Sequence, residues 1–391
     1  MKKLRTLLLP LALIGLIGCT YKKTENKIIS PEIILEHNIK SFIIIPITIK
    51  NKKYRFLVDT GASVNVINKK IAAEISTPYL LSDLHSSYQK FFSEVKSVSG
   101  AIDKDKYIFL KPQPFFIGTQ EISDEDVWLS MDLSLFIEAI GVDIDGVIGI
   151  ETFRKFSWQV DNIKKRLIVT KDAPSTHNYQ TCDGYMDTLN SMPTLWLKYN
   201  DIDDIAFMID TGADYGSIAD NFIHYLKNKS HLQSVSNQPE VDARGIHLES
   251  PGFILSGLIY NDMHVGEIRV GENNNQKYTM GMDFLSRFNR YTFIPSRMMF
   301  CYDAQSIQHN NILPIRNIAI RYINNHIEVF YNTNTVLIGT GLKNGDIILN
   351  ANGQYYAPEQ IGDLRTVLSD TPKAALELTI QRGTQKLVLQ I

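Results

Sequence analysis

The sequence predicts a mainly β protein with two similar lobes followed by a small α+β domain. Three observations predict this fold. A strand-like pattern that runs into Asp-Thr-Gly occurs twice, at 56–63 and at 207–214. Short apolar runs separated by turn residues follow each copy in the same order. From residue 312 onward the pattern changes to a set of short strand-like runs with a single helix.

Length and composition exclude some classes of protein. With 391 residues the chain is long enough for two or three domains, and 44% hydrophobic with 21% charged residues is typical of a globular protein. The formal net charge is −2, and it becomes −5 when the three basic residues among the first five positions are removed. An acidic chain of this kind is not expected to bind nucleic acid.

The first residues have the pattern of an export signal. A charged start precedes an apolar run at 7–18, which is too short to span a bilayer securely. The run ends in Leu-Ile-Gly-Cys19, which resembles the lipobox of bacterial lipoproteins. This resemblance implies a lipoprotein signal peptide at 1–19, a lipidated Cys19, and a tether at 20–32 that holds the protein to a membrane of the bacterial envelope, facing the periplasm or the cell surface. A plain signal peptide with an incidental cysteine is the alternative.

Each Asp-Thr-Gly copy follows a predicted hairpin. The expected strand pairs are 42–49 with 54–58 in the first lobe and 194–199 with 205–209 in the second. The first pair delivers Asp59 into a tight turn, and the second delivers Asp210. A short strand and a helix start follow each aspartate, with Asn68 and Asp220 as the predicted helix caps.

The two aspartates can form one catalytic site if the lobes bring them together. Two carboxyl groups a few ångströms apart cannot both ionise without cost, so one pKa rises and the pair holds a proton. The ionised carboxylate can then draw a proton from water while the protonated one donates to a substrate carbonyl oxygen. This chemistry needs no metal ion, no other cofactor and no nucleophilic side chain.

These turns resemble those of aspartic proteases of the pepsin and retropepsin kind, in which each lobe or subunit supplies one Asp-Thr-Gly turn. The resemblance implies bilobal acid-protease β-barrels within a single, monomeric catalytic unit. The expected domains are lobe 1 at 33–171, a linker at 172–185 and lobe 2 at 186–303. The resemblance also implies that Thr60 and Thr211 bond across the lobe junction, and that Gly61 and Gly212 let water and substrate approach closely. Structural turn carboxylates in an inactive relative are the alternative.

Two further features of this family have matches in the sequence. A hydrophobic-hydrophobic-Gly element packs beneath each catalytic turn, and the matching residues are Val147, Ile148 and Gly149 in lobe 1 and Thr279, Met280 and Gly281 in lobe 2. Flap hairpins are expected near Gly100 and Gly245, where ordinary surface hairpins are the alternative.

The remaining reactive side chains show no second chemistry. Cys182 and Cys301 lie near the two ends of lobe 2, and they can form a disulfide or remain buried free thiols. The histidines lack the spacing of a metal site. The tryptophans at 128, 158 and 196 lie in apolar runs, which predicts that all are core residues.

The segment 312–391 resembles a PDZ domain. The resemblance rests on the glycine-rich stretch at 341–348, on Asn352-Gly353, and on the closing hairpin around Arg382-Gly383. Such domains bind an extended peptide by strand addition, which implies a peptide ligand. The loop that holds a peptide carboxylate in PDZ domains has no match around 317–323.

The sequence therefore predicts an aspartic endopeptidase that hydrolyses extended polypeptides, with a PDZ-like domain that binds substrate or partner peptides. The alternative is a non-catalytic peptide-binding or scaffold lipoprotein of the bacterial envelope. Narrow processing of the protein's own tether or partner is a third hypothesis.

Overall fold

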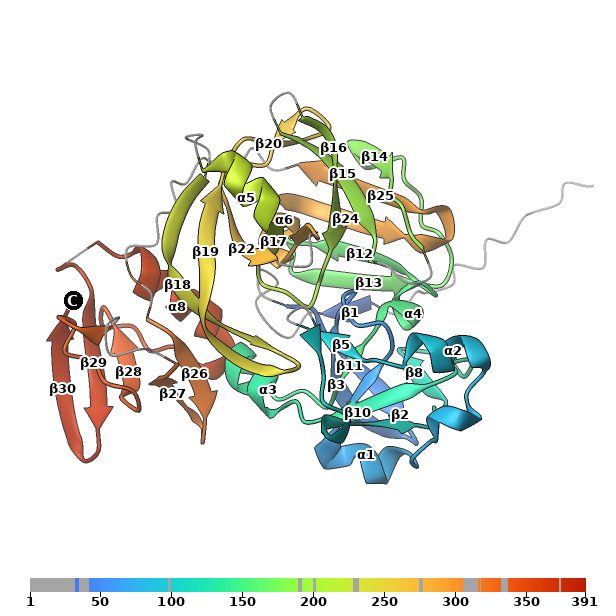
Figure 1. Cartoon of the computed structure of the whole chain (residues 1–391), viewed down its shortest axis with the longest axis horizontal. Helices are drawn as coiled ribbons and strands as arrows, with labels where there is room; N and C mark the ends of the chain where they lie inside the picture. Colours follow the sequence, from blue (N-terminus) through green and yellow to red (C-terminus); the bar gives the residue numbers. More distant parts are fainter. Residues whose placement is uncertain are drawn as a thin grey trace, which may run out of the picture. The chain divides into compact units, whose positions relative to one another are not determined.

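The computed structural model describes residues 32–34, 42–97, 100–188, 192–199, 202–227, 232–273, 277–304, 316, 318–331, 337–372 and 374–391. The predicted signal peptide, Cys19 and almost all of the predicted tether lie outside these residues. Within the described ranges, no helix combines the length and the apolar character needed to cross a membrane. Figure 1 shows the arrangement of the elements.

Lobe 1 is built on an eight-stranded sheet in the order β7-β10-β4-β11-β3-β2-β8-β9. Its strands are β2 (Ile44–Ile49), β3 (Lys52–Val58), β4 (Val66–Asn68), β7 (Tyr107–Leu110), β8 (Phe115–Ile117), β9 (Gln120–Ile122), β10 (Trp128–Met131) and β11 (Gly146–Ile148). Its helices are α1 (Lys69–Ile75), α2 (Ser86–Phe91), α3 (Ser134–Ile140) and α4 (Ile150–Phe153). The side chain of Asn68 caps α1 by accepting from the N–H of Lys70, as predicted.

Lobe 2 is built on a nine-stranded sheet in the order β18-β19-β22-β17-β23-β16-β15-β20-β21. Its strands are β15 (Thr194–Tyr199), β16 (Ile202–Ile209), β17 (Gly216–Ala219), β18 (Leu232–Asp242), β19 (Gly245–Leu255), β20 (Leu258–Tyr260), β21 (Met263–His264), β22 (Ile268–Asn273) and β23 (Thr279–Met280). Its helices are α5 (Asp220–Leu226) and α6 (Met282–Leu285). The cap of α5 is Ala219, so the prediction of Asp220 as the cap was wrong by one residue. As the first helical residue, Asp220 places a negative charge at the positive end of the helix dipole.

The two sheets share one topology around the Asp-Thr-Gly turns. In lobe 1, β11 pairs in parallel with β3 and antiparallel with β4, and β4 pairs in parallel with β10. In lobe 2, β23 relates in the same way to β16 and β17, and β17 pairs in parallel with β22. The repeat in the sequence is therefore a repeat of the fold.

A six-stranded sheet joins the lobes. Its order is β1 (Glu32–Ile34), β13 (Arg166–Thr170), β12 (Ser157–Asp161), β24 (Phe288–Ile294), β25 (Met299–Ala304) and β14 (Thr181–Gly184). Strand β12 of lobe 1 pairs antiparallel with β24 of lobe 2, so backbone hydrogen bonds connect the two halves. Strand β14 lies within the segment predicted as a linker, and it pairs with β25 through Cys182 and Cys301, which form a disulfide.

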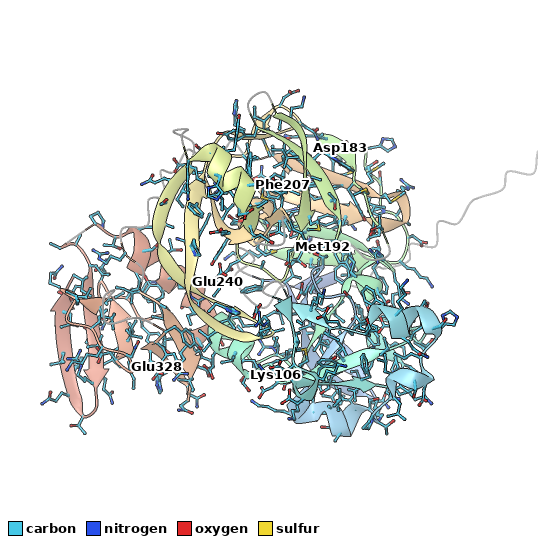
Figure 2. The ribbon with its side chains drawn as sticks, in the orientation of Figure 1. Lys106, Asp183, Met192, Phe207, Glu240 and Glu328 are labelled. Carbon is cyan, nitrogen blue, oxygen red and sulfur yellow. A yellow bond between two sulfur atoms is a disulfide. The ribbon has the colours of Figure 1, made fainter. Side chains whose placement is uncertain are left out.

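Aromatic side chains fill much of the core. Trp128 and Trp158 are each 1% exposed, and Phe207, labelled in Figure 2, is fully buried. Trp196 is 39% exposed, so its prediction as a core residue was wrong. Its strand, β15, alternates between faces, and Leu195 and Leu197 take the inward positions.

The C-terminal domain is a separate five-stranded sheet with its own apolar core. Its elements are β26 (Ile320–Ile323), β27 (His326–Val329), β28 (Ile347–Ala351), α8 (Ile361–Asp370), β29 (Glu377–Arg382) and β30 (Gln385–Gln390). The prediction of a mainly β protein with two acid-protease lobes and an additional domain is confirmed.

Candidate active site

Both Asp-Thr-Gly turns are held by the neighbouring parallel strand. Strand β3 ends at Val58, and the N–H of Asp59 donates to the carbonyl oxygen of Ile148 at 2.9 Å. In lobe 2, the N–H of Asp210 donates to the carbonyl oxygen of Met280 at 2.9 Å. The predicted packing residues at 147–149 and 279–281 therefore lie directly beneath the turns.

Two threonines lock the turns to each other across the lobe junction. The hydroxyl of Thr60 donates to the carbonyl oxygen of Ile209 at 2.6 Å and accepts from the N–H of Thr211 at 3.1 Å. The hydroxyl of Thr211 donates to the carbonyl oxygen of Val58 at 2.8 Å and accepts from the N–H of Thr60 at 3.0 Å. Both threonines are 1% exposed, so these four bonds are shielded from water.

The turn glycines show how close the two carboxyl groups lie. A Cβ added to Gly61 would sit 2.8 Å from Oδ2 of Asp210, and one added to Gly212 would sit 2.3 Å from Cγ of Asp59. Real Cβ atoms do not approach other atoms so closely, so both positions require glycine. Each carboxyl group thus packs against the backbone of the opposite turn.

Backbone donors orient the carboxyl groups. Oδ1 of Asp59 accepts from the N–H groups of Gly61 at 2.7 Å and Ala62 at 3.2 Å. Oδ1 of Asp210 accepts from the N–H of Gly212 at 2.9 Å. One oxygen of each carboxyl group is therefore held by its own turn.

The environment raises the pKa of both aspartates. Burial is the main cause for each, because it disfavours the charged carboxylate. The pKa of Asp210 lies well above its ordinary value because the charge of Asp59 adds to the effect of burial. The N–H groups of Gly61 and Gly212 act in the opposite direction, since they stabilise the ionised forms. Such a pair can hold one shared proton.

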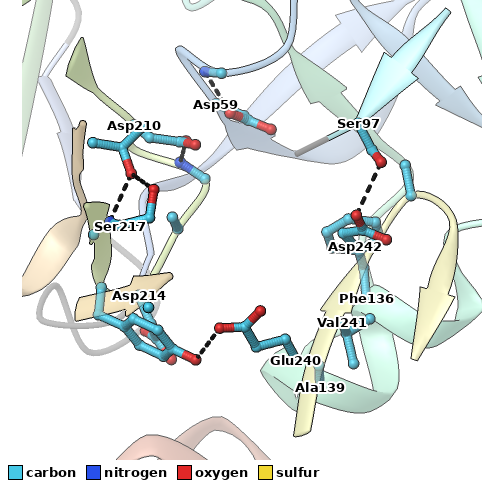
Figure 3. A pocket seen from close by; sticks show the side chains of 18 of the residues that line it. Asp59, Ser97, Phe136, Ala139, Asp210, Asp214, Ser217, Glu240, Val241 and Asp242 are labelled. Atoms are coloured by element: carbon cyan, nitrogen blue, oxygen red, sulfur yellow. Dashed lines mark hydrogen bonds between the residues drawn. The ribbon is translucent and has the colours of Figure 1, made fainter. Parts of the chain in front are cut away.

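The dyad opens into a cavity of about 1650 Å³. Cavities that bind small molecules typically measure about 300–1000 Å³, so this one has room for a longer ligand. Figure 3 shows Asp59 and Asp210 near each other at the cavity, with Ser97 and Asp242 across from them.

Hairpins from both lobes cover the cavity at the positions predicted for flaps. The lobe 1 hairpin joins β5 (Lys96–Ser97) to β6 (Gly100–Ala101), and the lobe 2 hairpin joins β18 to β19 just before Gly245. Their ends meet, because Oγ of Ser97 donates to Oδ2 of Asp242 at 2.9 Å. Nζ of Lys106 also donates to the carbonyl oxygen of Arg244 at 3.1 Å.

Several charged residues of the cavity were not predicted as site residues. Asp214, Glu240, Arg269, Asp283 and Arg365 all line it. The hydroxyl of Tyr215 donates to Oε1 of Glu240 at 3.0 Å, which links the second catalytic turn to its flap. Asp214 is the last residue of the second copy at 207–214 and Tyr215 follows it, so their positions could have marked them. No local pattern marks the other residues.

The described residues hold no group of three or more His, Cys, Asp or Glu side chains arranged to bind a metal ion. The catalytic role of Asp59 and Asp210 remains a prediction from the sequence.

Two Asp-Thr-Gly turns at the junction of two similar β lobes define an acid-protease type of site. Residues 45–152 match the family model of an aspartyl protease. The matched segment contains Asp59 and most of lobe 1. This match supports the interpretation of the protein as an aspartyl protease. A search of curated proteins found no match to the chain.

Proposed function

We propose that this protein is an aspartic endopeptidase that cleaves peptide bonds in extended polypeptides. The main evidence is the contact between the two turns. Gly61 lies against the carboxyl group of Asp210, and Gly212 lies against that of Asp59. The family match and the size of the cavity support the same function.

Hydrolysis follows from the shared proton of Asp59 and Asp210. The ionised carboxylate takes a proton from a water molecule, whose oxygen attacks the carbonyl carbon of the scissile bond. The protonated carboxyl group donates its proton to the carbonyl oxygen, which gives a tetrahedral diol. Proton transfer to the amide nitrogen and cleavage of the C–N bond then release two peptides and restore the dyad.

The raised pKa values set the expected pH dependence. Cleavage requires one proton on the pair, so it falls in acid, where both carboxyl groups are protonated. It also falls as the pH rises through the raised pKa of Asp210. We expect both limbs of the profile to lie above the ordinary aspartate pKa of 3.8, because burial raises both values.

Substitution of either aspartate tests the proposal. Asp59→Asn and Asp210→Asn are each expected to lower kcat/KM by about 100-fold or more, since each removes one partner of the acid–base pair. Asp262→Asn, at an exposed turn position, is the matched control. Thermal unfolding shows whether each variant is folded. Undiminished cleavage by both folded dyad variants between acidic and neutral pH contradicts the proposal.

A transition-state mimic separates the peptidase from a peptide-binding scaffold. A statine-type peptide places a hydroxyl group where the attacked carbon would lie, and a competent dyad binds it far more tightly than the matching substrate. Equal binding of both peptides would favour the scaffold lipoprotein instead.

We also propose that the C-terminal domain is PDZ-like and binds a segment of the substrate or a partner peptide. Strand β26 supports this function, since in the described part of the domain it pairs only with β27 and leaves one edge for strand addition. Isothermal titration with a series of C-terminal peptides would test it.

Lipid anchoring through Cys19 to a membrane of the bacterial envelope is the proposed location. The sequence before Cys19 supports it, and fatty-acid labelling that persists in Cys19→Ser would contradict it.

A further inference from the structure

The C-terminal domain lines the same cavity as the catalytic dyad. The start of the domain contributes Ile318, Ala319 and Ile320, and helix α8 contributes Gly362, Arg365 and Thr366. The cavity therefore continues from Asp59 and Asp210 to the space between β26 and α8.

Helix α3 of lobe 1 is the docking site of this domain. It packs against β26, as Figure 1 shows. Oε2 of Glu138 accepts from Nη1 of Arg321 and from the hydroxyl of Tyr331, each at 3.0 Å. The side chains of Glu138 and Arg321 are only 16% and 17% exposed, so this ion pair is shielded from water more than a surface ion pair is. The domain is thus held against the end of the cavity.

Arg365 reaches from α8 into this junction. Its Nη2 donates to the carbonyl oxygen of Ala139, at the C-terminal end of α3, and to the carbonyl oxygen of Ile320 at 3.2 Å. The carbonyl end of a helix carries partial negative charge, which favours a guanidinium group there. These bonds fix the plane of the group before any ligand binds.

The guanidinium group of Arg365 has N–H donors that no described residue uses. An arginine side chain carries five N–H donors, and both hydrogen bonds to described residues use Nη2. The Nε–H and Nη1–H groups thus have no acceptor among the described residues. Burial lowers the pKa of Arg365 while Asp214 acts in the opposite direction, and Arg365 and Arg269 likewise oppose the rise in the pKa of Asp214. Asp214, which follows the second catalytic turn, therefore lies in the electrostatic range of Arg365.

We propose that Arg365 is a specificity-determining residue, whose guanidinium donates to a backbone carbonyl oxygen of a polypeptide that runs from the dyad past Asp214 to the C-terminal domain. The proposal rests on the proposed function and adds a third domain to its substrate-binding cleft. It restricts efficient cleavage to chains long enough to reach from the scissile bond to Arg365. Because the contact is made to the backbone, it selects for an extended, unfolded chain rather than for one side chain.

A nested series of peptides with one scissile bond tests the proposal. The series runs from about 4 to about 12 residues, since an extended chain spans roughly 3.4 Å per residue. In the full-length protein, KM should fall when the peptide becomes long enough to reach Arg365. Arg365→Leu should raise KM about 10- to 100-fold for long peptides only, which corresponds to the loss of one charge-assisted hydrogen bond. Its kcat should remain unchanged.

Two further variants complete the test. Lys386→Leu removes an exposed cation from the same domain and should leave the length dependence unchanged. Arg365→Lys keeps the charge but has fewer and differently placed donors. Its KM for long peptides should therefore lie between those of wild type and Arg365→Leu. This variant decides the result if Arg365→Leu fails to fold. Equal loss for short and long peptides, or no loss in either, overturns the proposal. Dyad variants abolish cleavage at every length, so failure of the proposed function is distinguishable.

Discussion

The two lobes carry the same catalytic turn in different surroundings. In both, a buried strand, a threonine and a glycine hold the aspartate, and the bonds run between backbone groups and the paired hydroxyls. After the motif, lobe 1 continues with Ser63, which is exposed, whereas lobe 2 continues with Asp214, which lies near Arg269 and Arg365. The two aspartates are thus held by symmetric backbone geometry. The asymmetry lies in the side chains that follow each turn and line the cavity.

The flaps differ in the same way. The lobe 2 flap has two strands of 11 residues each, whereas the strands of the lobe 1 flap have 2 residues each. The long flap belongs to the nine-stranded sheet, whereas the short flap is a separate two-stranded hairpin, which is only marginally stable alone. We therefore expect the lobe 1 flap to depend on contacts with lobe 2.

Alanine at the two turn glycines should give the largest effects. Gly212→Ala places its Cβ 2.3 Å from Cγ of Asp59, and Gly61→Ala places it 2.8 Å from Oδ2 of Asp210. Either carboxyl group must move, and misplaced catalytic groups cost about 100-fold or more in rate. We expect a larger loss of kcat for Gly212→Ala because its contact is shorter. Gly184→Ala, where the nearest atom lies 3.9 Å from the added Cβ, controls for the substitution. Unimpaired catalysis by both turn variants would show that the carboxyl groups tolerate displacement.

Valine at the paired threonines should lower stability by similar amounts in the two lobes. Thr60→Val leaves the carbonyl of Ile209 and the N–H of Thr211 unpaired, and Thr211→Val does the same to the carbonyl of Val58 and the N–H of Thr60. Each buried unpaired group costs about 1–3 kcal/mol, so we expect a loss of about 2–6 kcal/mol in the free energy of unfolding.

Denaturant unfolding measures this loss, with the exposed Thr119→Val as control. Each hydroxyl makes its own two bonds, so the two single variants should lose similar amounts of stability. A loss confined to one variant would show that the junction is less symmetric than its hydrogen bonds.

The sequence predicted the dyad because its signals are local and repeated. Asp59 and Asp210 each follow a strand and precede a glycine, and the surrounding hairpins recur in order. The face of Trp196 was predictable too, since Leu195, Leu197 and Tyr199 alternate with Trp196 and Lys198 along β15. The prediction rested on the apolar run around Trp196 and not on this alternation, and it was wrong for that reason.

Contacts between distant segments were not predictable. Tyr215 and Glu240 meet over the cavity, and Arg365 reaches the end of α3 from another domain. Residues of these types occur throughout the chain, and only the folded arrangement distinguishes these from the rest. The two Asp-Thr-Gly turns are therefore encoded locally, whereas the cavity beside them depends on tertiary packing.

The acidic residue after each packing glycine should differ in its effect on stability. Burial raises the pKa of Asp283 in lobe 2 from 3.8 to about 7, and its Oδ2 is buried with no hydrogen-bond partner among the described residues. Its counterpart in lobe 1, Glu151, accepts from the hydroxyl of Tyr88 at 3.0 Å. Because the folded pKa of Asp283 is raised, its contribution to stability is complete below pH 3.8 and is lost as the pH rises through about 7.

Asp283→Asn should remove this pH dependence. A shift of about 3 pKa units at about 1.36 kcal/mol each corresponds to at most about 4 kcal/mol in the free energy of unfolding. We expect the free energy of unfolding of the variant to increase relative to that of wild type as the pH rises from about 4 to about 7. Urea unfolding at several pH values measures this change. Glu151→Gln is the matched control and should change the slope less, since Tyr88 stabilises its ionised form. Parallel curves for Asp283→Asn and wild type would contradict the raised pKa.

The smallest expected effect concerns the contact between the flaps. Ser97→Ala removes the bond to Oδ2 of Asp242, which contributes about 0.5–1.5 kcal/mol or less, so KM should rise only a few-fold. The difference between the flaps appears in hydrogen exchange: amides of β5 and β6 should exchange faster in the variant, while those of the long β18 and β19 ladder should change little. Ser93→Ala, whose hydroxyl bonds only within its own segment to the carbonyl of Lys90, is the control. Equal acceleration in both hairpins would mean that the long flap also depends on the short one.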